Sequence, residues 1–403
     1  MKIGIVISLN SEYESMWVNG IKLNALNLSK MLGQIPGNDV YILDAGHKVN
    51  DMTKVSWDYN KYKVAKFDDM KLEVDLLFML GASLPTTSIL SLKINNPKIK
   101  IIKYQCGNSY VVDMEKSLFG DPDTNDKASW DKHHDETWVI PQQELHNLEY
   151  YRTIYKQKGD RVKIVPFIWD PEPLDEFDKK LIATGHNVPG YTPKNSSEKR
   201  ISVMEPNLNV LKYSMIPLMI AENVFSDFGK DSFKIINICS GNRLIKHKYF
   251  GSMIKRLDIV NHNLDGKSEN KVKFTPRYPV STILSTSTDI VLSHQWGNPL
   301  NYSYLDAMYY GYPLVHNASM IQDAGYYYPD FDISKGADQL KHVLDHHDSN
   351  LEEYAEKNKS VLNRYLSTNK DIVDIYTKLI ENVFKKDTHK MTYEYDWKTN
   401  LYK

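Results

Sequence analysis

Two polar residues, Asn298 and Asp306, stand eight positions apart directly after the largely apolar stretch 289–293. The stretch predicts a buried strand, and the spacing of apolar residues beyond it predicts a helix. Asn298 would then lie in the connecting loop and Asp306 in the first turns of the helix, where both can face one ligand. The start of a helix offers free N–H groups and a positive dipole end to anions. Asn301 and Ser303 could add hydrogen bonds to a phosphate there, so the pattern indicates a site for an anionic ligand.

The whole segment 294–316 resembles the donor-binding signature of GT-B-fold glycosyltransferases. In that signature two acidic residues at this spacing hold the sugar and the ribose of a nucleotide-sugar donor. Asn298 stands in place of the first acid, and Asp306 matches the second. The resemblance implies that Asn298 contacts the sugar and Asp306 the ribose; an ordinary buried strand–turn–helix unit is the alternative. The small residues and the turn of the signature are present as Ala307, Met308, Gly311 and Pro313.

The diphosphate of such a donor requires cations or convergent N–H groups, because it leaves as an anion. Lys212 lies five residues after Asn207 and, by its pattern, just inside a helix that follows the first strand of the second half. The pair resembles the Arg and Lys of the family that contact the leaving diphosphate, although Asn207 carries no charge. Arg243 and Arg277 each follow a further strand and could supply the missing charge. A solvent-facing lysine is the alternative for Lys212.

Two further loops could line the site that the resemblance implies. His294 and Trp296 shortly precede Asn298 and could line the pocket for the sugar donor, although core packing explains Trp296 better. Asn19 and Gly20 follow the first strand of the chain, at the sheet edge where such folds bind ligands. Gly20 permits close approach of the backbone to a phosphate or an acceptor. A simple glycine-containing turn is the alternative.

Candidate catalytic residues lie in the segment 104–115, which leaves a strand of the first half and is expected to face the acceptor. Asp113 or Glu115 could act as a base, and Asn108 could orient an acceptor hydroxyl. Only an inverting mechanism requires such a base, because in a retaining enzyme the leaving phosphate can itself take the proton. We expect a retaining enzyme. Ordinary loop and helix-cap residues are the alternative.

The elements that must position these residues alternate between strands and helices, which is the pattern of a doubly wound parallel sheet. In the first half, strands are expected at 2–8, 40–43, 74–80, 101–104, 137–140 and 162–165, and helices at 21–32 and 144–155. In the second half, strands are expected at 200–204, 233–239, 272–274, 290–293 and 314–316, with helices around 212–225 and 350–384. The polar stretch 171–199 is expected to be an irregular linker or insertion.

The resemblance and this alternation together predict an α/β protein of the GT-B type, with two Rossmann-like doubly wound domains facing across a cleft. The domain 1–168 would take the acceptor, and the domain 169–379 would bind the nucleotide sugar. A C-terminal helix, at about 380–403, is expected to cross back to the first domain.

The bulk composition is that of a globular protein. A length of 403 residues favours two domains, and 41% of the residues are hydrophobic and 25% charged. No stretch approaches the roughly 20 apolar residues that span a bilayer, and the N-terminus predicts a strand and not a signal peptide, so we expect a cytoplasmic protein. Cys106 and Cys239 adjoin apolar segments and are expected to be core thiols. A net charge of −1 gives no global attraction to nucleic acid, although a local basic face remains open.

The segments 106–108, 204–209 and 294–306 together resemble an uncharacterised GT-B branch of bacteria and phages. Some phages glycosylate hydroxymethylcytosine in their own DNA with enzymes of this fold. The resemblance therefore implies a nucleotide sugar, a UDP-sugar by preference, as co-substrate and duplex DNA as the favoured acceptor. Lys246 and Lys248, with His247, could hold the DNA backbone. Solvated surface lysines explain these residues equally well.

No metal and no permanently bound cofactor are expected. The pairs His133-His134 and His346-His347 have metal-ligand residue types, but adjacent residues do not share a helix face. Two alternatives to a DNA-modifying enzyme stay open. One is a transferase with a glycan or protein acceptor. The other is a catalytically silent nucleotide-binding or interaction module, and the missing acid at position 298 is the reason to consider it.

Overall fold

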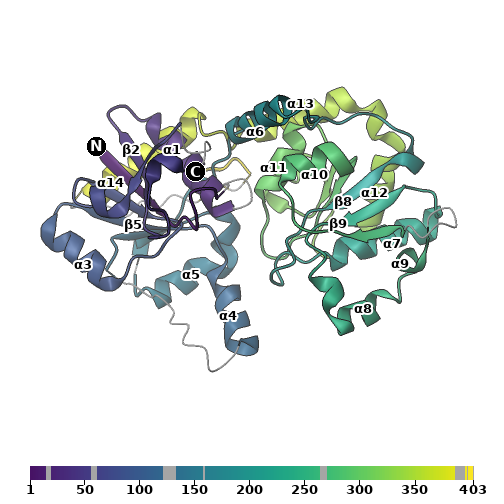
Figure 1. The fold of residues 1–403 in the computed structure, drawn as a ribbon, viewed down its shortest axis with the longest axis horizontal. Helices are drawn as coiled ribbons and strands as arrows, with labels where there is room; N and C mark the ends of the chain where they lie inside the picture. The colour runs from purple at the N-terminus through teal and green to yellow at the C-terminus, as the bar shows by residue number, and fades with distance from the viewer. Residues whose placement is uncertain are drawn as a thin grey trace. The chain divides into compact units, whose positions relative to one another are not determined.

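The computed structural model describes residues 1–14, 20–55, 61–120, 133–157, 159–263, 270–385, 395–396 and 398–402. The chain divides into two compact units (Figure 1). The first comprises Met1–Asp170 and Arg364–Lys403, and the second Pro171–Asn363. The expected boundary at 168 lies near the observed one, whereas the chain returns to the first unit at Arg364, earlier than the expected 380.

The first unit is built on a seven-stranded parallel sheet with the order β3-β2-β1-β4-β5-β6-β7. Apart from Lys2 at the start of β1, the central strands β1 and β4 are apolar and buried, as expected for a parallel sheet covered on both faces. The strands are β1 (Lys2–Ile7), β2 (Asp39–Asp44), β3 (Lys63–Lys66), β4 (Leu76–Met79), β5 (Lys100–Gln105), β6 (Glu136–Val139) and β7 (Val162–Ile164). The helices are α1 (Gly20–Gly33), α2 (Phe67–Met70), α3 (Thr86–Asn95), α4 (Ser109–Phe119), α5 (Glu144–Ile154) and α14 (Lys370–Phe384). A short hairpin, β14 (Tyr395–Asp396) and β15 (Leu401–Tyr402), follows α14.

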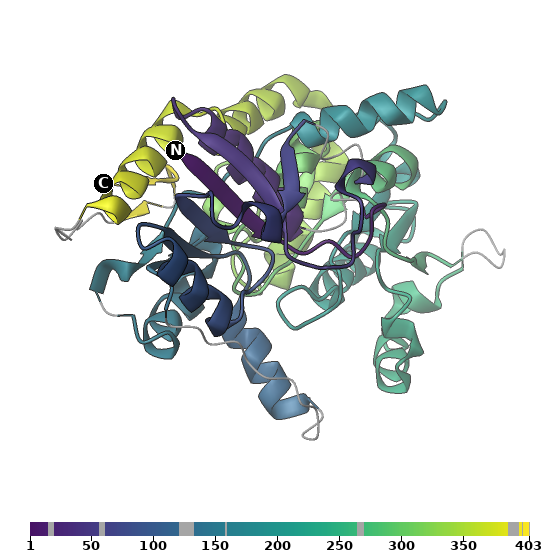
Figure 2. The ribbon, with the colours of Figure 1, turned by 60° about the vertical axis from the view of Figure 1, so that its left-hand side comes forward.

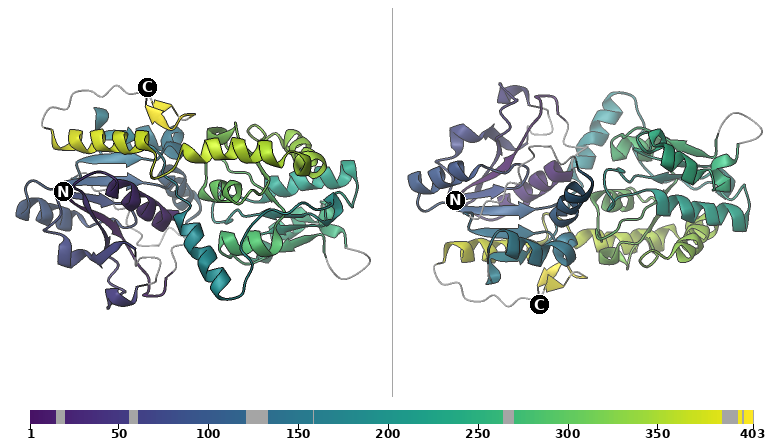
Figure 3. Two further views of the ribbon diagram at one scale, coloured as in Figure 1. Left: turned by 90° about the horizontal axis from the view of Figure 1, so that it is seen from above. Right: turned by 90° about the horizontal axis from the view of Figure 1, so that it is seen from below.

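Helix α14 brings the end of the chain back to the first unit, where it packs beside α1 (Figures 2 and 3). The hydroxyl of Tyr376 on this helix donates to the carbonyl oxygen of Pro166 at 2.8 Å and lies 2.8 Å from the hydroxyl of Tyr104 on β5. Its ring also meets Trp138 edge to face. The C-terminal helix therefore crosses back to the N-terminal sheet, as the GT-B type predicts, but it spans 370–384, and the expected range of about 380–403 is wrong because strands β14 and β15 occupy its end.

The second unit contains a six-stranded parallel sheet with the order β10-β9-β8-β11-β12-β13. Its core joins Ile201, Ile236 and Leu292 of the strands to Leu340 of a covering helix. The strands are β8 (Arg200–Val203), β9 (Ile235–Ile238), β10 (Val272–Phe274), β11 (Ile290–Leu292), β12 (Leu314–His316) and β13 (Tyr326–Tyr327). The helices are α6 (Glu172–Ala183), α7 (Met215–Phe228), α8 (Lys248–Ile254), α9 (Asp258–Asn261), α10 (Val280–Ser287), α11 (Tyr302–Tyr309), α12 (Ile333–His346) and α13 (Leu351–Asn363).

The sequence expectations for the stretch 171–199 and for the helix 350–384 are wrong. The stretch 171–199 is not wholly irregular, because α6 occupies its first part and buries Leu174. The expected helix 350–384 is two helices, α13 and α14. The chain breaks between them, where Leu366 bridges to Trp169 and the side chain of Asn369 caps α14 by accepting from the N–H of Asp371 at 2.9 Å. A capping asparagine starts a new helix by satisfying one of its free N–H groups.

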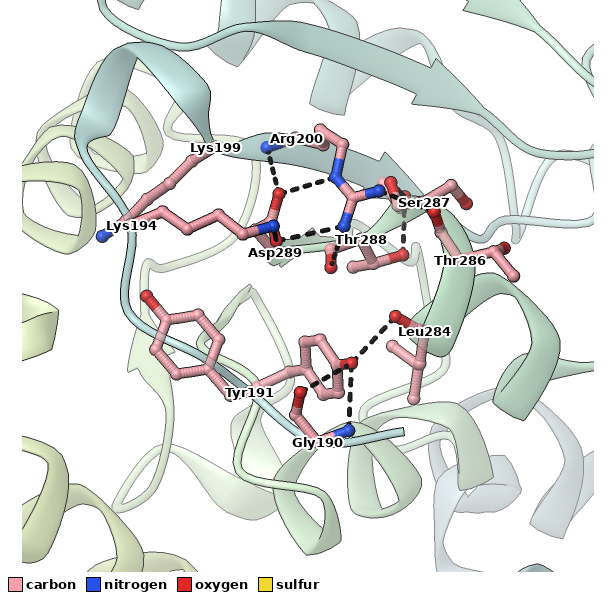
Figure 4. A network of polar contacts seen from close by, with 12 residues as sticks. Gly190, Tyr191, Lys194, Lys199, Arg200, Leu284, Thr286, Ser287, Thr288 and Asp289 are labelled. Carbon is pink, nitrogen blue, oxygen red and sulfur yellow. Dashed lines mark hydrogen bonds and ion pairs between the residues drawn. The ribbon is translucent and has the colours of Figure 1, made fainter. Parts of the chain in front are cut away.

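Two carboxylates, Asp289 and Asp348, bind the segment that follows α6 to the rest of the second unit, and Figure 4 shows the contacts of Asp289. Asp289 accepts from Lys194 Nζ at 2.7 Å and from the backbone N–H and Nε of Arg200, both at 2.8 Å. Asp348 pairs with Lys199 Nζ at 2.9 Å and also accepts from the hydroxyl of Tyr191. Arg200 begins β8 and Asp289 directly precedes β11, so this network lies at the edge of the sheet where the strands start. The opposite edge is left for a ligand site.

Among the described residues, no helix combines the length and the apolar character that crossing a membrane requires. Cys106 and Cys239 are free thiols, and Cys239 is buried. Burial raises the pKa of Cys239 to about 11, which keeps the thiol protonated and inert.

Candidate functional site

The candidate site lies at the edge of the second sheet where its parallel strands end, which we call the carboxyl edge. The loops that follow β8, β9, β10 and β11 carry Lys212, Arg243, Arg277 and Asn298, respectively. Since all these strands are parallel, their loops meet at one edge, the place where open α/β sheets bind ligands. Arg243 and Arg277 are exposed, and Lys212 is partly buried. Three cations from three loops therefore share this edge.

The loop between β8 and α7 differs from the expected helix. Lys212 lies in this loop and not inside the helix, which begins only at Met215 after the N-cap residue Ser214. Asn207 explains the difference: it adopts a φ of 52°, and its side chain accepts from the N–H of Ser214 at 2.9 Å and donates to the carbonyl oxygens of Glu205 and Cys239. Asparagine tolerates this left-handed conformation, and its side-chain bonds compete with helix formation. Asn207 thus shapes the loop that presents Lys212.

Several polar groups of this loop have no partner among the described residues. The ammonium group of Lys212 forms no ion pair there, and the buried oxygens of Asn209 (Oδ1) and Ser214 (Oγ) form no hydrogen bond. Ser214 is 2% exposed and stands at the start of the 14-residue helix α7 without capping it. The Lys212 ammonium group and the Ser214 hydroxyl can both donate to an anion at this helix start, whereas the Asn209 oxygen can only accept.

The start of α11, like that of α7, has no side-chain cap. Asn301 is its N-cap residue, with extended backbone and no side-chain bond to the first turn, and Ser303 is partly exposed in that turn. Asp306 lies one turn further on and is buried, with 6% of its surface exposed. The structure therefore places Asn301, Ser303 and Asp306 on one short helix at the carboxyl edge, as their spacing predicts. Their binding roles stay predictions.

Sequence reasoning missed Glu205 as a site residue. This carboxylate lies two residues after the end of β8, is 2% exposed, and accepts from Ser293 Oγ and, at 2.8 Å, from Gln295 Nε2 of the loop after β11. The hydroxyl of Tyr304 lies 2.7 Å from the same Ser293 Oγ. The available signal in the sequence was a glutamate immediately after the expected strand 200–204. The ends of neighbouring parallel strands lie at one edge of a sheet, so the residues that follow them come together.

Burial raises the pKa of Glu205 to about 7, against the opposing effects of the Ser293 hydrogen bond and the positive charge of Lys212. Burial also lowers the pKa of Lys212, an effect that Glu205 opposes and Arg277 reinforces. Glu205, Lys212 and Arg277 therefore belong to one electrostatic unit at the carboxyl edge.

The network around Glu205 explains why Asn298 stands where the family signature carries an acid. Gln295 donates with its Nε2 to Glu205, so its Oε1 faces the other way and accepts from Asn298 Nδ2. The same Nδ2 also donates to the carbonyl oxygen of Leu300 at 3.3 Å. A carboxylate at position 298 would meet these two oxygens with no proton to donate.

His294 is buried and neutral. Burial lowers its pKa to about 4. The hydroxyl of Tyr328 donates to the carbonyl oxygen of Ser293 at 3.0 Å and lies 3.1 Å from His294 Nδ1. Since that hydroxyl has only one proton, Nδ1 of His294 carries the imidazole proton, and the buried Nε2, which has no partner among the described residues, is an acceptor. His294 therefore suits a ligand hydroxyl better than a phosphate.

The candidate catalytic residues of the first unit have structural partners. Asn108 is the N-cap of α4: its Oδ1 accepts from the N–H of Val111 at 3.1 Å and from Asn147 Nδ2 at 3.0 Å. Asp113 accepts from the hydroxyl of Tyr150 at 2.7 Å. These contacts are those of helix-cap and surface residues, which the sequence left open as the alternative, and catalytic roles for both residues stay predictions.

Gly20 begins α1, and Asn19 lies outside the described residues. Across the part of the chain that the structure describes, no three His, Cys, Asp or Glu side chains are grouped so that they could hold a metal ion.

The fold is that of the GT-B class. The N-terminal domain of Candida albicans trehalose-6-phosphate phosphatase is similar over 95% of this chain and 96% of its own (TM-score 0.54, 11% identity). The catalytic domain of Arabidopsis thaliana starch synthase IV bound to ADP and acarbose is similar over 95% and 99% (TM-score 0.53, 11% identity). A DNA-modifying β-glucosyltransferase studied with and without uridine diphosphoglucose is similar over 94% and 100% (TM-score 0.51, 15% identity).

Within this class, the chain belongs to the family described as "Protein of unknown function (DUF2827)", whose profile matches residues 3–380. The comparison with curated proteins gives no match. Solved chains can be longer than this one, which spans 55% of the S. aureus TarM chain that it resembles (TM-score 0.44, 14% identity, 77% of this chain). At these identities the likeness to solved structures concerns the fold.

Proposed function

We propose that the protein is a glycosyltransferase that moves a sugar from a nucleoside-diphosphate sugar, a UDP-sugar by preference, to an acceptor hydroxyl. The observation that carries the proposal is the carboxyl edge of the second sheet, where Lys212, Arg243 and Arg277 meet two helix starts without side-chain caps. Cations and free N–H groups are what a diphosphate leaving group requires. The GT-B fold of similar solved enzymes supports the same conclusion.

Each residue has a stated role in this proposal. Lys212, with Arg243 or Arg277, neutralises the diphosphate, whose negative charge grows as its bond to the sugar breaks. Asp306 accepts the ribose hydroxyls, and Asn298 with His294 contacts the sugar. The neutral acceptor nitrogen of His294 is compatible with a sugar hydroxyl.

The reaction is proposed to retain the configuration of the sugar. The bond between the sugar carbon and the diphosphate oxygen breaks, a bond to the acceptor oxygen forms, and the acceptor proton passes to the leaving diphosphate. No separate base is then needed, which agrees with the engagement of Asp113 by the Tyr150 hydroxyl. Product analysis by NMR would distinguish retention from inversion.

The first test is a screen of UDP- and GDP-sugars for release of the nucleoside diphosphate without an acceptor. Slow hydrolysis of one donor is the expected result. The rival hypothesis, a catalytically silent nucleotide-binding module, predicts binding without release for every donor. A screen without release or binding would contradict both.

For the acceptor, we propose a hydroxymethylated base in duplex DNA. The support is the segment 243–249 after β9, in which Lys246, His247 and Lys248 are exposed together with Ile245 and Tyr249, at 52% and 84% exposure. Lysines contact phosphates, and an exposed tyrosine offers a stacking surface for a base that leaves the helix. The similar DNA-modifying β-glucosyltransferase supports this choice.

Gel-shift titrations at several salt concentrations test the DNA proposal. The double variant Lys246→Ala/Lys248→Ala should weaken binding and flatten its salt dependence, because fewer counterions are released. The exposed lysines of α13 provide the control, as Lys357→Ala/Lys359→Ala. Salt-independent binding, or no sugar on hydroxymethylated DNA when donors are supplied, would favour a glycan or protein acceptor.

A further inference from the structure

Glu205 is a buried carboxylate inside the proposed site that no step of the reaction uses. It receives hydrogen bonds from Ser293 Oγ, from Gln295 Nε2 at 2.8 Å, and from the backbone N–H of His294. All three belong to the loop after β11, whereas Glu205 follows β8. The carboxylate therefore joins two loops of the carboxyl edge, and a bond from the N–H of Trp296 to the carbonyl oxygen of Leu211 at 3.0 Å joins them again.

The charged and titratable groups around Glu205 are few. Lys212 approaches from the β8–α7 loop and attracts the carboxylate, and Arg277 from the loop after β10 repels Lys212 in turn. The hydroxyls of Tyr304 and Tyr328 face it from α11 and from the residue after β13, and both stay protonated because burial and Glu205 raise their pKa. His294, with a pKa lowered to about 4 by burial, stays neutral. Lys212 is thus the cation that favours the ionised form of Glu205.

We propose that Glu205 is a proton-linked positioning residue: it holds the loop after β11, with Gln295 and Asn298, in place, and it takes up a proton when an anionic diphosphate binds to Lys212. This inference rests on the proposed binding of a nucleotide sugar at the carboxyl edge.

The physical reason is electrostatic competition for one lysine. Without ligand, the charge of Lys212 favours the ionised carboxylate against the cost of burial. A bound diphosphate neutralises the charge of Lys212 and adds its own negative field. Lys212 then no longer stabilises the ionised form of Glu205, so the proton affinity of the carboxyl rises. The pKa of about 7 without ligand places this uptake in the neutral range.

Uptake of the proton leaves the hydrogen-bond network intact. A protonated carboxyl keeps an oxygen that can accept from Gln295 Nε2, so the Oε1 of Gln295 still faces Asn298. The proton therefore removes a repulsion between Glu205 and the diphosphate without releasing the loop. Binding should strengthen as the pH falls from 8 to 6, by at most about tenfold per pH unit.

Calorimetric titration of the full chain with UDP-glucose, in buffers of different ionisation enthalpy, measures the proton uptake directly. A nucleotide sugar is the right probe because free UDP has a terminal phosphate that itself titrates at about pH 6. We expect uptake of a fraction of a proton, up to about one, near pH 7. The variant Glu205→Gln should bind without uptake and with a flat pH profile. The control Glu136→Gln removes a buried carboxyl of the first unit whose pKa burial also raises, and it should keep the uptake.

The outcomes separate the two proposals. Binding of UDP-glucose without proton uptake, or uptake that persists in Glu205→Gln and so belongs to Lys212, would overturn this inference and leave the proposed function standing. No binding of UDP- or GDP-sugars would overturn both. Even where Glu205→Gln fails to fold, absence of proton uptake by the wild type would overturn the inference.

Discussion

At the scale of single residues, the sequence located the carboxyl edge but not its organising group. Lys212, Arg243, Arg277, Asn298 and Asp306 could be found because each follows a predicted strand or matches a family signature. In the sequence alone, the amide of Asn298 indicates the loss of the acid that the family signature carries at this position. Its reason, the orientation of Gln295 by Glu205, depends on contacts between loops that only the fold brings together.

This explanation makes a prediction about Asn298→Asp. A carboxylate there would replace two donated hydrogen bonds by repulsion from the oxygens of Gln295 and Leu300. We expect a loss of about 1–3 kcal/mol in the free energy of unfolding at neutral pH, measured by denaturant titration. The exchange Asn301→Asp is the control, because Asn301 makes no side-chain bond to its helix. Equal stability of Asn298→Asp and the wild type would contradict the proposed orientation.

A second prediction at this scale concerns Asp306. If its carboxylate accepts the ribose hydroxyls, Asp306→Ala should lose roughly 1–3 kcal/mol of nucleotide-sugar affinity, since the hydroxyls then lose their partner. Calorimetry with UDP-glucose measures the loss, and the thermal unfolding midpoint shows whether the variant is folded. Unchanged affinity would remove Asp306 from the site.

At the scale of elements, alternation of apolar strands and helices was enough to predict the two sheets. Strand β3 was missed because its four residues include two lysines and lie at a sheet edge. Strand β13 was missed as well, because it has only two residues. Helix α6 was missed because its charged residues hid a short apolar stripe, and Lys212 was placed in a helix because the side-chain bonds of Asn207 cannot be read from periodicity.

The element-scale prediction concerns the segment between α6 and β8. Asp289→Ala would leave Lys194 and Arg200 without their shared carboxylate, which should cost about 3 kcal/mol of unfolding free energy. Asp345→Ala is the matched control: it breaks only the pair with Lys341 on α12 and should cost about 0.3–0.5 kcal/mol. Denaturant titration at pH 7 measures both. Similar losses in the two variants would contradict the anchoring role of Asp289.

At the scale of the whole molecule, the GT-B architecture follows from the order of elements, including the return of the chain to its first unit. The point of return, Arg364, could not be predicted because the chain between α13 and α14 breaks through a cap at Asn369 and a bridge from Leu366 to Trp169. These are local and long-range contacts without a periodic signature.

The whole molecule should lose stability in mild acid. His316 and His347 are fully buried, and burial lowers the pKa of each to about 4 from an ordinary value of 6.5. The unfolded chain therefore binds these protons first, so their contribution is complete above pH 6.5 and is lost progressively between pH 6.5 and 4. Thermal unfolding midpoints across this range should fall, and His347→Phe should lessen the fall, whereas the exposed His346→Asn should not. A flat profile for the wild type would contradict the burial of these side chains.

The central claim, that the carboxyl edge of the second sheet binds a nucleoside diphosphate, is tested most directly by titrating the protein and one variant with UDP-glucose at low salt. Lys212→Met should lower the affinity ten- to a hundredfold, by about 1.5–3 kcal/mol, because a hydrogen bond to a charged phosphate is lost. Lys273→Met, which removes an exposed lysine from β10 of the same sheet, should leave it unchanged. Equal affinities for the wild type and Lys212→Met would contradict the claim.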